Sequence, residues 1–157
     1  IRFGKPSLVG IATGMVAGLA TVTPASGFIG VPGGLILGLS GGIICYFSVD
    51  LIRSKLKIDD SLDVFAVHGV GGILVTLMVS FLALETFSGA GLAKEMSVNS
   101  QFLAQLFGVF LIVIWTLIFT YIALKITSLF TSLRVEEQEE IEGLDLRSHG
   151  ERAYYND

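Results

Sequence analysis

Long apolar runs alternate with short polar segments along this 157-residue chain. The runs cover residues 7–25, 30–49, 66–84 and 102–124. Each holds about the 20 residues that a helix needs to cross about 30 Å of hydrocarbon. We therefore predict helices at about residues 7–25, 30–49, 63–84 and 102–126. A soluble core could contain one such run, but four in succession predict an all-α, polytopic membrane bundle over residues 1–128.

The composition agrees with a membrane protein that carries a polar tail. Hydrophobic residues make up 52% of the chain and charged residues 15%, whereas soluble domains carry about 25% charged residues. Five glutamates lie between residues 136 and 142 and account for much of the net charge of −4. We expect residues 129–157 to form a solvated and flexible tail. Residues 1–6 resemble a connecting loop, so the chain is expected to be the C-terminal part of a longer protein.

Basic residues predict the orientation of the four helices. With four spans, nine of the ten Lys and Arg residues fall on one side of the membrane, before the first span, between the second and third, and after the fourth. The opposite side holds only Lys94. Cytoplasmic loops carry the excess of Lys and Arg. We therefore place the tail in the cytoplasm of a multi-pass protein of the plasma or inner membrane.

Glycine recurs at every fourth position in the first two predicted spans. These glycines are Gly10, Gly14 and Gly18 in the first span, and Gly30, Gly34, Gly38 and Gly42 in the second. Such bare helix faces let neighbouring backbones approach closely inside a bilayer. The spacing predicts a tightly packed helical pair and carries no chemistry of its own.

A single ionisable residue, His68, lies inside the third apolar segment. Val64 and Gly72 lie one turn before and one turn after it on the same helix face. That face would suit a pore for a small neutral molecule, because intramembrane ionisable residues usually mark pathways. The alternative is a histidine that a hydrogen bond satisfies inside the bundle. These residues alone leave both interpretations open.

Polar residues open the third helix. Asp60 and Ser61 are expected to cap its first backbone N–H groups, whereas Asp63 lies further in and is less easily explained as a cap. Neither a metal site nor an enzyme is predicted. His68 has no second His, Cys or carboxylate at a ligand spacing, and no paired nucleophile is evident. We expect no cofactor.

Three motifs resemble the ammonium transporters of the Amt/MEP/Rh family. The segment from Asp59 to Gly72, with the sequence DDSLDVFAVHGVGG, is similar to the family's second-histidine signature. Residues 4–10 and 20–27 resemble its eighth span and the loop that follows. The segment GLDLRSHGERAY at residues 143–154 resembles its cytoplasmic tail, in the form typical of the Amt branch.

The resemblance implies a homotrimeric channel-like transporter of eleven helices, of which this chain would supply the last four. In the family, ammonium is deprotonated at an outer aromatic vestibule, and ammonia crosses a hydrophobic pore lined by two histidines. His68 matches the second histidine and Val64 a pore-lining position. Asp63 matches the helix start beside the pore. The first histidine and the vestibule would lie on helices that precede this chain.

The resemblance also gives the tail a regulatory role at the cytoplasmic face. The tail would touch the neighbouring subunit and influence gating, and trimeric PII signalling proteins dock at this face in prokaryotic members. The residues that carry the tail motif are Gly143, Asp145, His149, Glu151 and Tyr154. The leading hypothesis is ammonium transport. The alternative is an ammonium sensor of the same fold that signals through this tail.

Overall fold

The computed structural model describes residues 7–152 of the chain. These residues form helices and turns, with no strand among them. The chain divides into two compact units, Ile1–Leu111 and Ile112–Asp157. The first unit holds three helices and the start of a fourth, and the second holds the rest of that helix and the tail.

Two helices joined by a tight turn open the first unit. Helix α1 spans Leu8–Val22, and the Ser7 hydroxyl accepts the Gly10 N–H at 3.3 Å as its cap. A 3-10 turn at Thr23–Ala25 follows. Helix α2 spans Val31–Asp50 and has a proline in its first turn. Proline is tolerated there because N–H groups of the first turn have no intrahelical acceptor.

The helical run of α2 extends past the expected end at residue 49. It continues as a π-helical turn at Leu51–Lys55, whose basic side chains suit the negative end of a helix. A second π-helical turn at Phe65–Gly69 leads directly into α3, Val70–Leu82. The third expected helix therefore begins later than residue 63, because the loop backbone turns at that point.

Helix α4, Val98–Thr127, is longer than expected because its first turn begins four residues before position 102. Within residues 7–152, four helical segments are long and apolar enough to cross a membrane. They are Leu8–Ala25, Val31–Lys55, Phe65–Leu82 and Val98–Thr127. The predicted all-α membrane architecture with four spans is confirmed.

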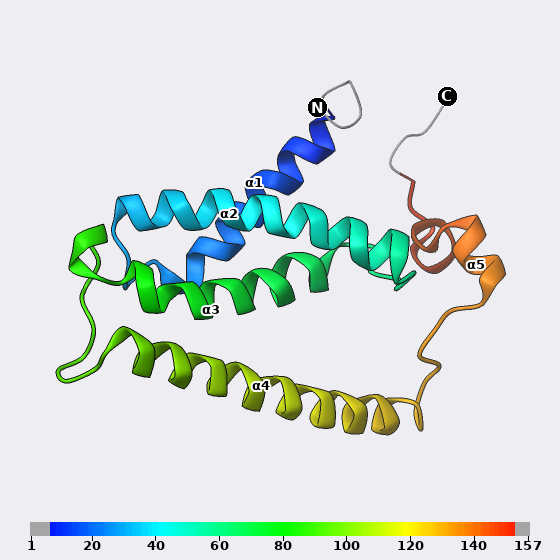
Figure 1. Ribbon diagram of the computed structural model, residues 1–157. Coiled ribbons are helices and arrows are strands. Elements are labelled where there is room, and N and C mark those ends of the chain that lie inside the picture. The colour runs from blue at the N-terminus through cyan, green and yellow to red at the C-terminus, as the bar shows by residue number, and fades with distance from the viewer. Residues whose placement is uncertain (1–6, 153–157) are drawn as a thin grey trace. The chain divides into compact units, whose positions relative to one another are not determined.

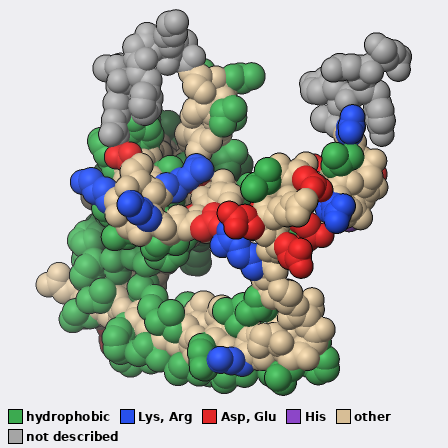
Figure 2. Space-filling view, turned by 90° about the vertical axis from the view of Figure 1, so that its right-hand side faces the viewer, with side chains coloured by type: hydrophobic (Ala, Val, Ile, Leu, Met, Phe, Trp, Pro, Cys, Tyr) green, Lys and Arg blue, Asp and Glu red, His purple; other side chains and the backbone are tan. Residues whose placement is uncertain are grey.

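Apolar side chains cover much of the helical surface (Figure 2). Leu8, Leu39 and Phe107 are among the many large apolar residues that are more than half exposed. None of the residues of α4 is buried. Surfaces of this kind are stable against lipid or against further apolar helices, and costly in water.

Helices α1, α2 and α3 pack against one another in the first unit (Figure 1). Thr21 of α1 is fully buried at their junction, with its hydroxyl donating to the Ala17 carbonyl at 2.7 Å. A Cβ added to Gly41 of α2 would lie 2.5–2.7 Å from three Thr21 side-chain atoms. A Cβ on Gly71 of α3 would lie 3.0 Å from the Thr21 hydroxyl oxygen. Two glycines on different helices thus accommodate one threonine.

The predicted glycine faces account for only part of this packing. A Cβ on Gly18 would lie 3.3 Å from the Gly38 carbonyl oxygen, so close approach is confirmed there. A Cβ on Gly34 would meet nothing within 4 Å among the described residues, so no close approach is seen at Gly34 there. The closest approach to Thr21 comes from Gly41, which lies outside the predicted series.

The second unit contains the end of α4 and a folded tail. Helix α5 spans Glu137–Glu142, and a π-helical turn follows at Asp145–His149. Arg134 binds Glu140 through two hydrogen bonds of 2.8 and 3.0 Å. The acidic run was expected to be a flexible segment. It contains the short helix α5, and Arg134 and Arg147 form ion pairs with three of its glutamates.

Candidate functional site

The helix that carries His68 is capped by one carboxylate. Asp60 accepts the backbone N–H groups of Val64, Phe65 and Ala66 at 2.8, 2.9 and 3.3 Å. Three N–H groups that lack an intrahelical acceptor are thereby satisfied, and the negative charge lies at the positive helix end. The capping role predicted for Asp60 is confirmed.

The second expected cap is absent, since Ser61 does not bind the helix. Its hydroxyl donates to Asp59 Oδ1 at 3.2 Å instead. Between Ser61 and the helix the backbone reverses at Asp63, which has a φ of 55°. Asp tolerates this left-handed conformation better than most residues. The reversal brings Asp60, and not Ser61, to the helix end.

Asp63 also forms an ion pair with the preceding helix. Its Oδ1 lies 3.4 Å from Nη1 of Arg53 in the π-helical turn that ends the α2 run. The Asp63 side chain is 17% exposed and that of Arg53 is 50% exposed. The Asp63 carbonyl accepts the Val67 N–H at 2.8 Å, so the residue belongs to both the loop and the new helix.

One side of the His68 turn packs inward. Ala66 and Val67 are buried, at 0% and 5% exposure. The Cys45 thiol of α2 donates to the Val67 carbonyl at 3.8 Å, and these two residues form a small apolar cluster with Ala17 of α1. This contact holds the inner side of the turn against α1 and α2.

The opposite side of the same turn is open. His68 is exposed, and Val64 is 52% exposed. A Cβ added to Gly72 would meet nothing within 4 Å among the described residues. The structure therefore places Val64, His68 and Gly72 on an uncovered side of the helix. No group within residues 7–152 hydrogen-bonds the His68 imidazole, so these residues do not supply the partner that the packing interpretation requires.

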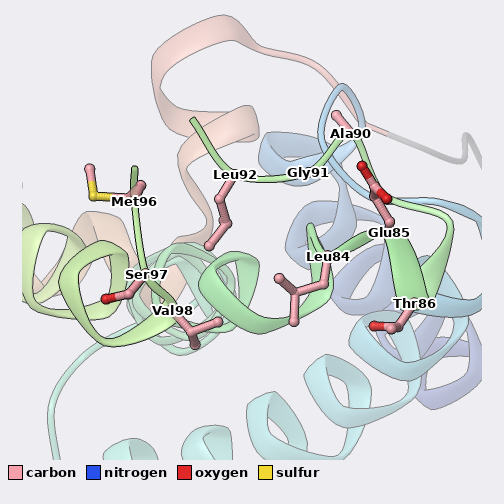
Figure 3. A pocket seen from close by; sticks show the side chains of 9 residues that line it. All are labelled: Leu84, Glu85, Thr86, Ala90, Gly91, Leu92, Met96, Ser97 and Val98. Carbon is pink, nitrogen blue, oxygen red and sulfur yellow. The ribbon is translucent and has the colours of Figure 1, made fainter. Parts of the chain in front are cut away.

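A pocket of about 510 Å³ lies in the loop between α3 and α4 (Figure 3), and His68 is not among the residues that line it. Glu85 is the one charged residue among the nine that line it. Ser97 and Met96 lie on the far side of the pocket from Glu85 (Figure 3). The Ser97 and Ser100 hydroxyls form a hydrogen bond of 2.8 Å with each other. Because its polar groups do not converge, this pocket is a weaker site than the His68 face.

The structure brings most of the expected tail residues together in one short segment. The Gly143 carbonyl accepts the Arg147 N–H at 3.1 Å, and the Asp145 carbonyl accepts the Glu151 N–H at 3.1 Å. Arg147 also lies 3.6 Å from Glu139 and 3.8 Å from Glu142. His149 is exposed in the π-helical turn, and Tyr154 lies outside the described residues.

Gly143 has a specific backbone reason to be glycine. It follows α5 with a φ of 94° and a ψ of 126°, a conformation that residues with a Cβ rarely adopt. Its N–H donates to the Glu139 carbonyl at 3.0 Å and so closes the helix. The glycine allows the chain to turn sharply between α5 and the segment with Arg147.

Sequence reasoning missed Arg53. The available signal was a pair of opposite charges, ten residues apart, at the two ends of a short loop between predicted helices. Spacing alone could not identify the pair, because Lys55 and Lys57 lie in the same loop.

Comparisons with known proteins agree with the resemblance found in the motifs. The model of the Ammonium Transporter Family matches residues 1–154. A putative ammonium transporter of Methanothermobacter thermautotrophicus is 39% identical over 156 residues, which are 98% of this chain and 38% of the relative. Ammonium transporter Amt1 of Archaeoglobus fulgidus is 44% identical over 153 residues, with 96% of this chain and 38% of the relative covered.

A eukaryotic protein is similar over the same stretch. Ammonium transporter 1 of Dictyostelium discoideum is 40% identical over 154 residues, which are 98% of this chain and 33% of the relative. The chain thus spans 33–38% of the length of these three curated relatives. The family match covers nearly the whole chain, and the chain has four apolar helices long enough to span a membrane. The chain therefore belongs to the Ammonium Transporter Family.

Proposed function

We propose that this chain forms the last four membrane helices and the tail of an eleven-helix ammonium transporter. The supporting observation is the open side of the third helix, where Val64 and His68 are exposed and a Cβ on Gly72 would meet nothing within 4 Å among residues 7–152. Helices that precede residue 1 in the full protein would cover this side and complete a pore. The missing helices would also supply the first pore histidine and the outer recognition site.

The chemistry of the open side suits ammonia better than an ion. Val64 and Gly72 offer no charge to a passing molecule, and an apolar pore makes the transfer of an ion costly. His68 can both donate and accept a hydrogen bond. A neutral molecule that does the same, such as ammonia, can therefore pass along this side. Ammonium would have to lose its proton before it entered.

The surroundings of His68 favour a fixed geometry. Asp60 holds the start of the helix through three N–H groups, and the Cys45 thiol contacts the inner side of the turn at the Val67 carbonyl. A site is most precise when rigid elements and their supporting contacts hold it. His68 would then present its ring to the pore at a constant depth.

We further propose that the protein is a homotrimer in the plasma or inner membrane, with its tail in the cytoplasm. The orientation rests on the nine basic residues of one side against Lys94 on the other. The folded tail, with α5 and the Arg147 ion pairs, offers a defined surface at that side. A neighbouring subunit or a PII signalling protein would bind there and regulate conduction.

The direct test is flux through the full-length protein. Purified protein in liposomes is expected to carry ammonium-dependent flux, measured as a pH change inside the vesicle, above that of protein-free liposomes. Methylammonium uptake provides a second substrate. A sensor of the same fold would bind ammonium and move its tail with negligible flux. Flux at the level of empty liposomes, with ammonium binding intact, would therefore reject transport in favour of sensing.

A further inference from the structure

Two π-helical turns flank the loop between the α2 run and α3, and one ion pair spans this loop. The first turn, Leu51–Lys55, carries Arg53, and the second, Phe65–Gly69, begins two residues after Asp63. The Arg53–Asp63 ion pair of 3.4 Å therefore links the end of the α2 run to the start of the His68 helix. Lys55 and Lys57 have no ion-pair partner within residues 7–152.

The backbone conformation of Asp63 sets the direction in which Val64 and the helix continue. Its backbone is in the left-handed region, with a φ of 55°, and Val64 comes immediately after it. Its carbonyl accepts the Val67 N–H, one residue before His68. A change in the Asp63 backbone would rotate the first turn and alter the bonds from Val64, Phe65 and Ala66 to Asp60.

The side chain of Asp63 is placed to support the left-handed backbone that this residue adopts. A non-glycine residue at positive φ is uncommon, and it persists when surrounding contacts hold it in place. The Asp63 side chain is mostly covered, at 17% exposure, and Arg53 is the cation that it contacts. The ion pair thus ties the residue at this left-handed position to the end of the α2 run.

We propose that Arg53 is a positioning residue, which acts through Asp63 to hold the first turn of the His68 helix in the geometry required for conduction. The part of this inference that concerns conduction rests on the proposed transport function. The part that concerns the helix start does not. The two parts can therefore be tested by separate measurements on the same variants.

The first measurement is amide hydrogen exchange in the full-length protein. Arg53→Gln removes the charge and is expected to speed exchange at Val64, Phe65 and Ala66 by about two- to fivefold, the range that an ion pair at a protein surface supplies. Arg53→Lys keeps the charge and is expected to restore most of the protection. Lys55→Gln, which removes a charge from the same turn, is the matched control and should leave these amides unchanged.

The second measurement is ammonium uptake, normalised to the amount of protein in the membrane. Arg53→Gln is expected to lower the maximal rate by at most about fivefold, the factor that a surface ion pair can supply, and to leave the half-saturating concentration unchanged, because outer recognition is proposed to lie on other helices. A general loss of folding would lower the amount of protein, and that effect is removed by the normalisation. Arg53→Lys should recover the rate, and Lys55→Gln should match the wild type.

The outcomes separate the two parts of the inference. Unchanged exchange in Arg53→Gln, or equal effects of Arg53→Gln and Lys55→Gln, would overturn the positioning role. Faster exchange with an unchanged uptake rate would overturn the link to conduction. A wild-type protein without any uptake would reject the proposed function, while the exchange result would still decide whether Arg53 holds the helix start.

Discussion

Replacing Asp60 by alanine is expected to release the start of the His68 helix. Three backbone N–H groups, those of Val64, Phe65 and Ala66, lose their acceptor in this variant. Loss of a helix cap costs about 0.5–2 kcal/mol. Because one carboxylate serves three donors here, we expect a value near the upper end, about 2 kcal/mol. Val64 and His68 would then lose their fixed position.

The measurements for Asp60→Ala are the thermal unfolding midpoint of the purified full-length protein and amide exchange at residues 64–66. We expect a lower midpoint and clearly faster exchange at these three amides. Ser61→Ala is the matched control, because the Ser61 hydroxyl bonds Asp59 and not the helix. If Ser61→Ala lowered the midpoint as much as Asp60→Ala does, the capping account of this loop would be wrong.

The second large effect is expected at the junction of the first three helices. In Gly41→Ala, the new methyl group would lie 2.5–2.7 Å from Thr21 atoms that include the side-chain Cβ. Rotation of the Thr21 side chain cannot relieve the contact with Cβ, so α1 and α2 must move apart. Overpacking of this kind costs about 1–3 kcal/mol. Thr21 is fully buried and leaves no space into which the strain could relax.

Gly34→Ala is the matched control on the same helix. A Cβ at Gly34 meets nothing within 4 Å among the described residues. Alanine also favours a helix over glycine by about 1 kcal/mol. The unfolding midpoint is therefore expected to fall in Gly41→Ala and to stay constant or rise in Gly34→Ala. Equal midpoints for the two variants would contradict the packing described for Thr21.

The four membrane helices could be predicted from sequence because length and hydrophobicity are enough to define a span. Their ends could not be predicted in the same way. The α2 run continues through Leu51–Lys55 although its last turn is basic, since basic side chains stabilise a helix C-terminus. The first turn of α4 begins at Val98, before the apolar run that signals the span.

The loop before His68 illustrates the limit of local spacing rules. A usual cap bonds N–H groups two or three residues ahead. Asp60 instead accepts N–H groups four to six residues ahead, because the backbone reverses at Asp63. Asp60 could be predicted as a cap. That it accepts three N–H groups depends on the reversal at Asp63, and so do the different partner of Ser61 and the ion pair with Arg53.

Glycine spacing has a similar limit. A repeat of four predicts that a helix face is bare, but it does not say which neighbour approaches that face. Gly41 and Gly71 are the glycines that Thr21 requires, and neither belongs to the predicted series. In the tail, charge alone predicted flexibility, and it did not predict that Arg134 and Arg147 pair with glutamates of the short helix α5.

The central claim is that the path for ammonia passes His68, and ammonium uptake by the full-length His68→Ala variant tests it most directly. We predict a change in the maximal uptake rate of about tenfold, which corresponds to about 1.4 kcal/mol in the barrier, or a changed preference between ammonium and methylammonium. The uptake rate is normalised to the amount of folded protein in the membrane, so that a loss of folding is not counted as a loss of conduction. Unchanged uptake together with unchanged preference would contradict a conduction path along the open side of Val64, His68 and Gly72.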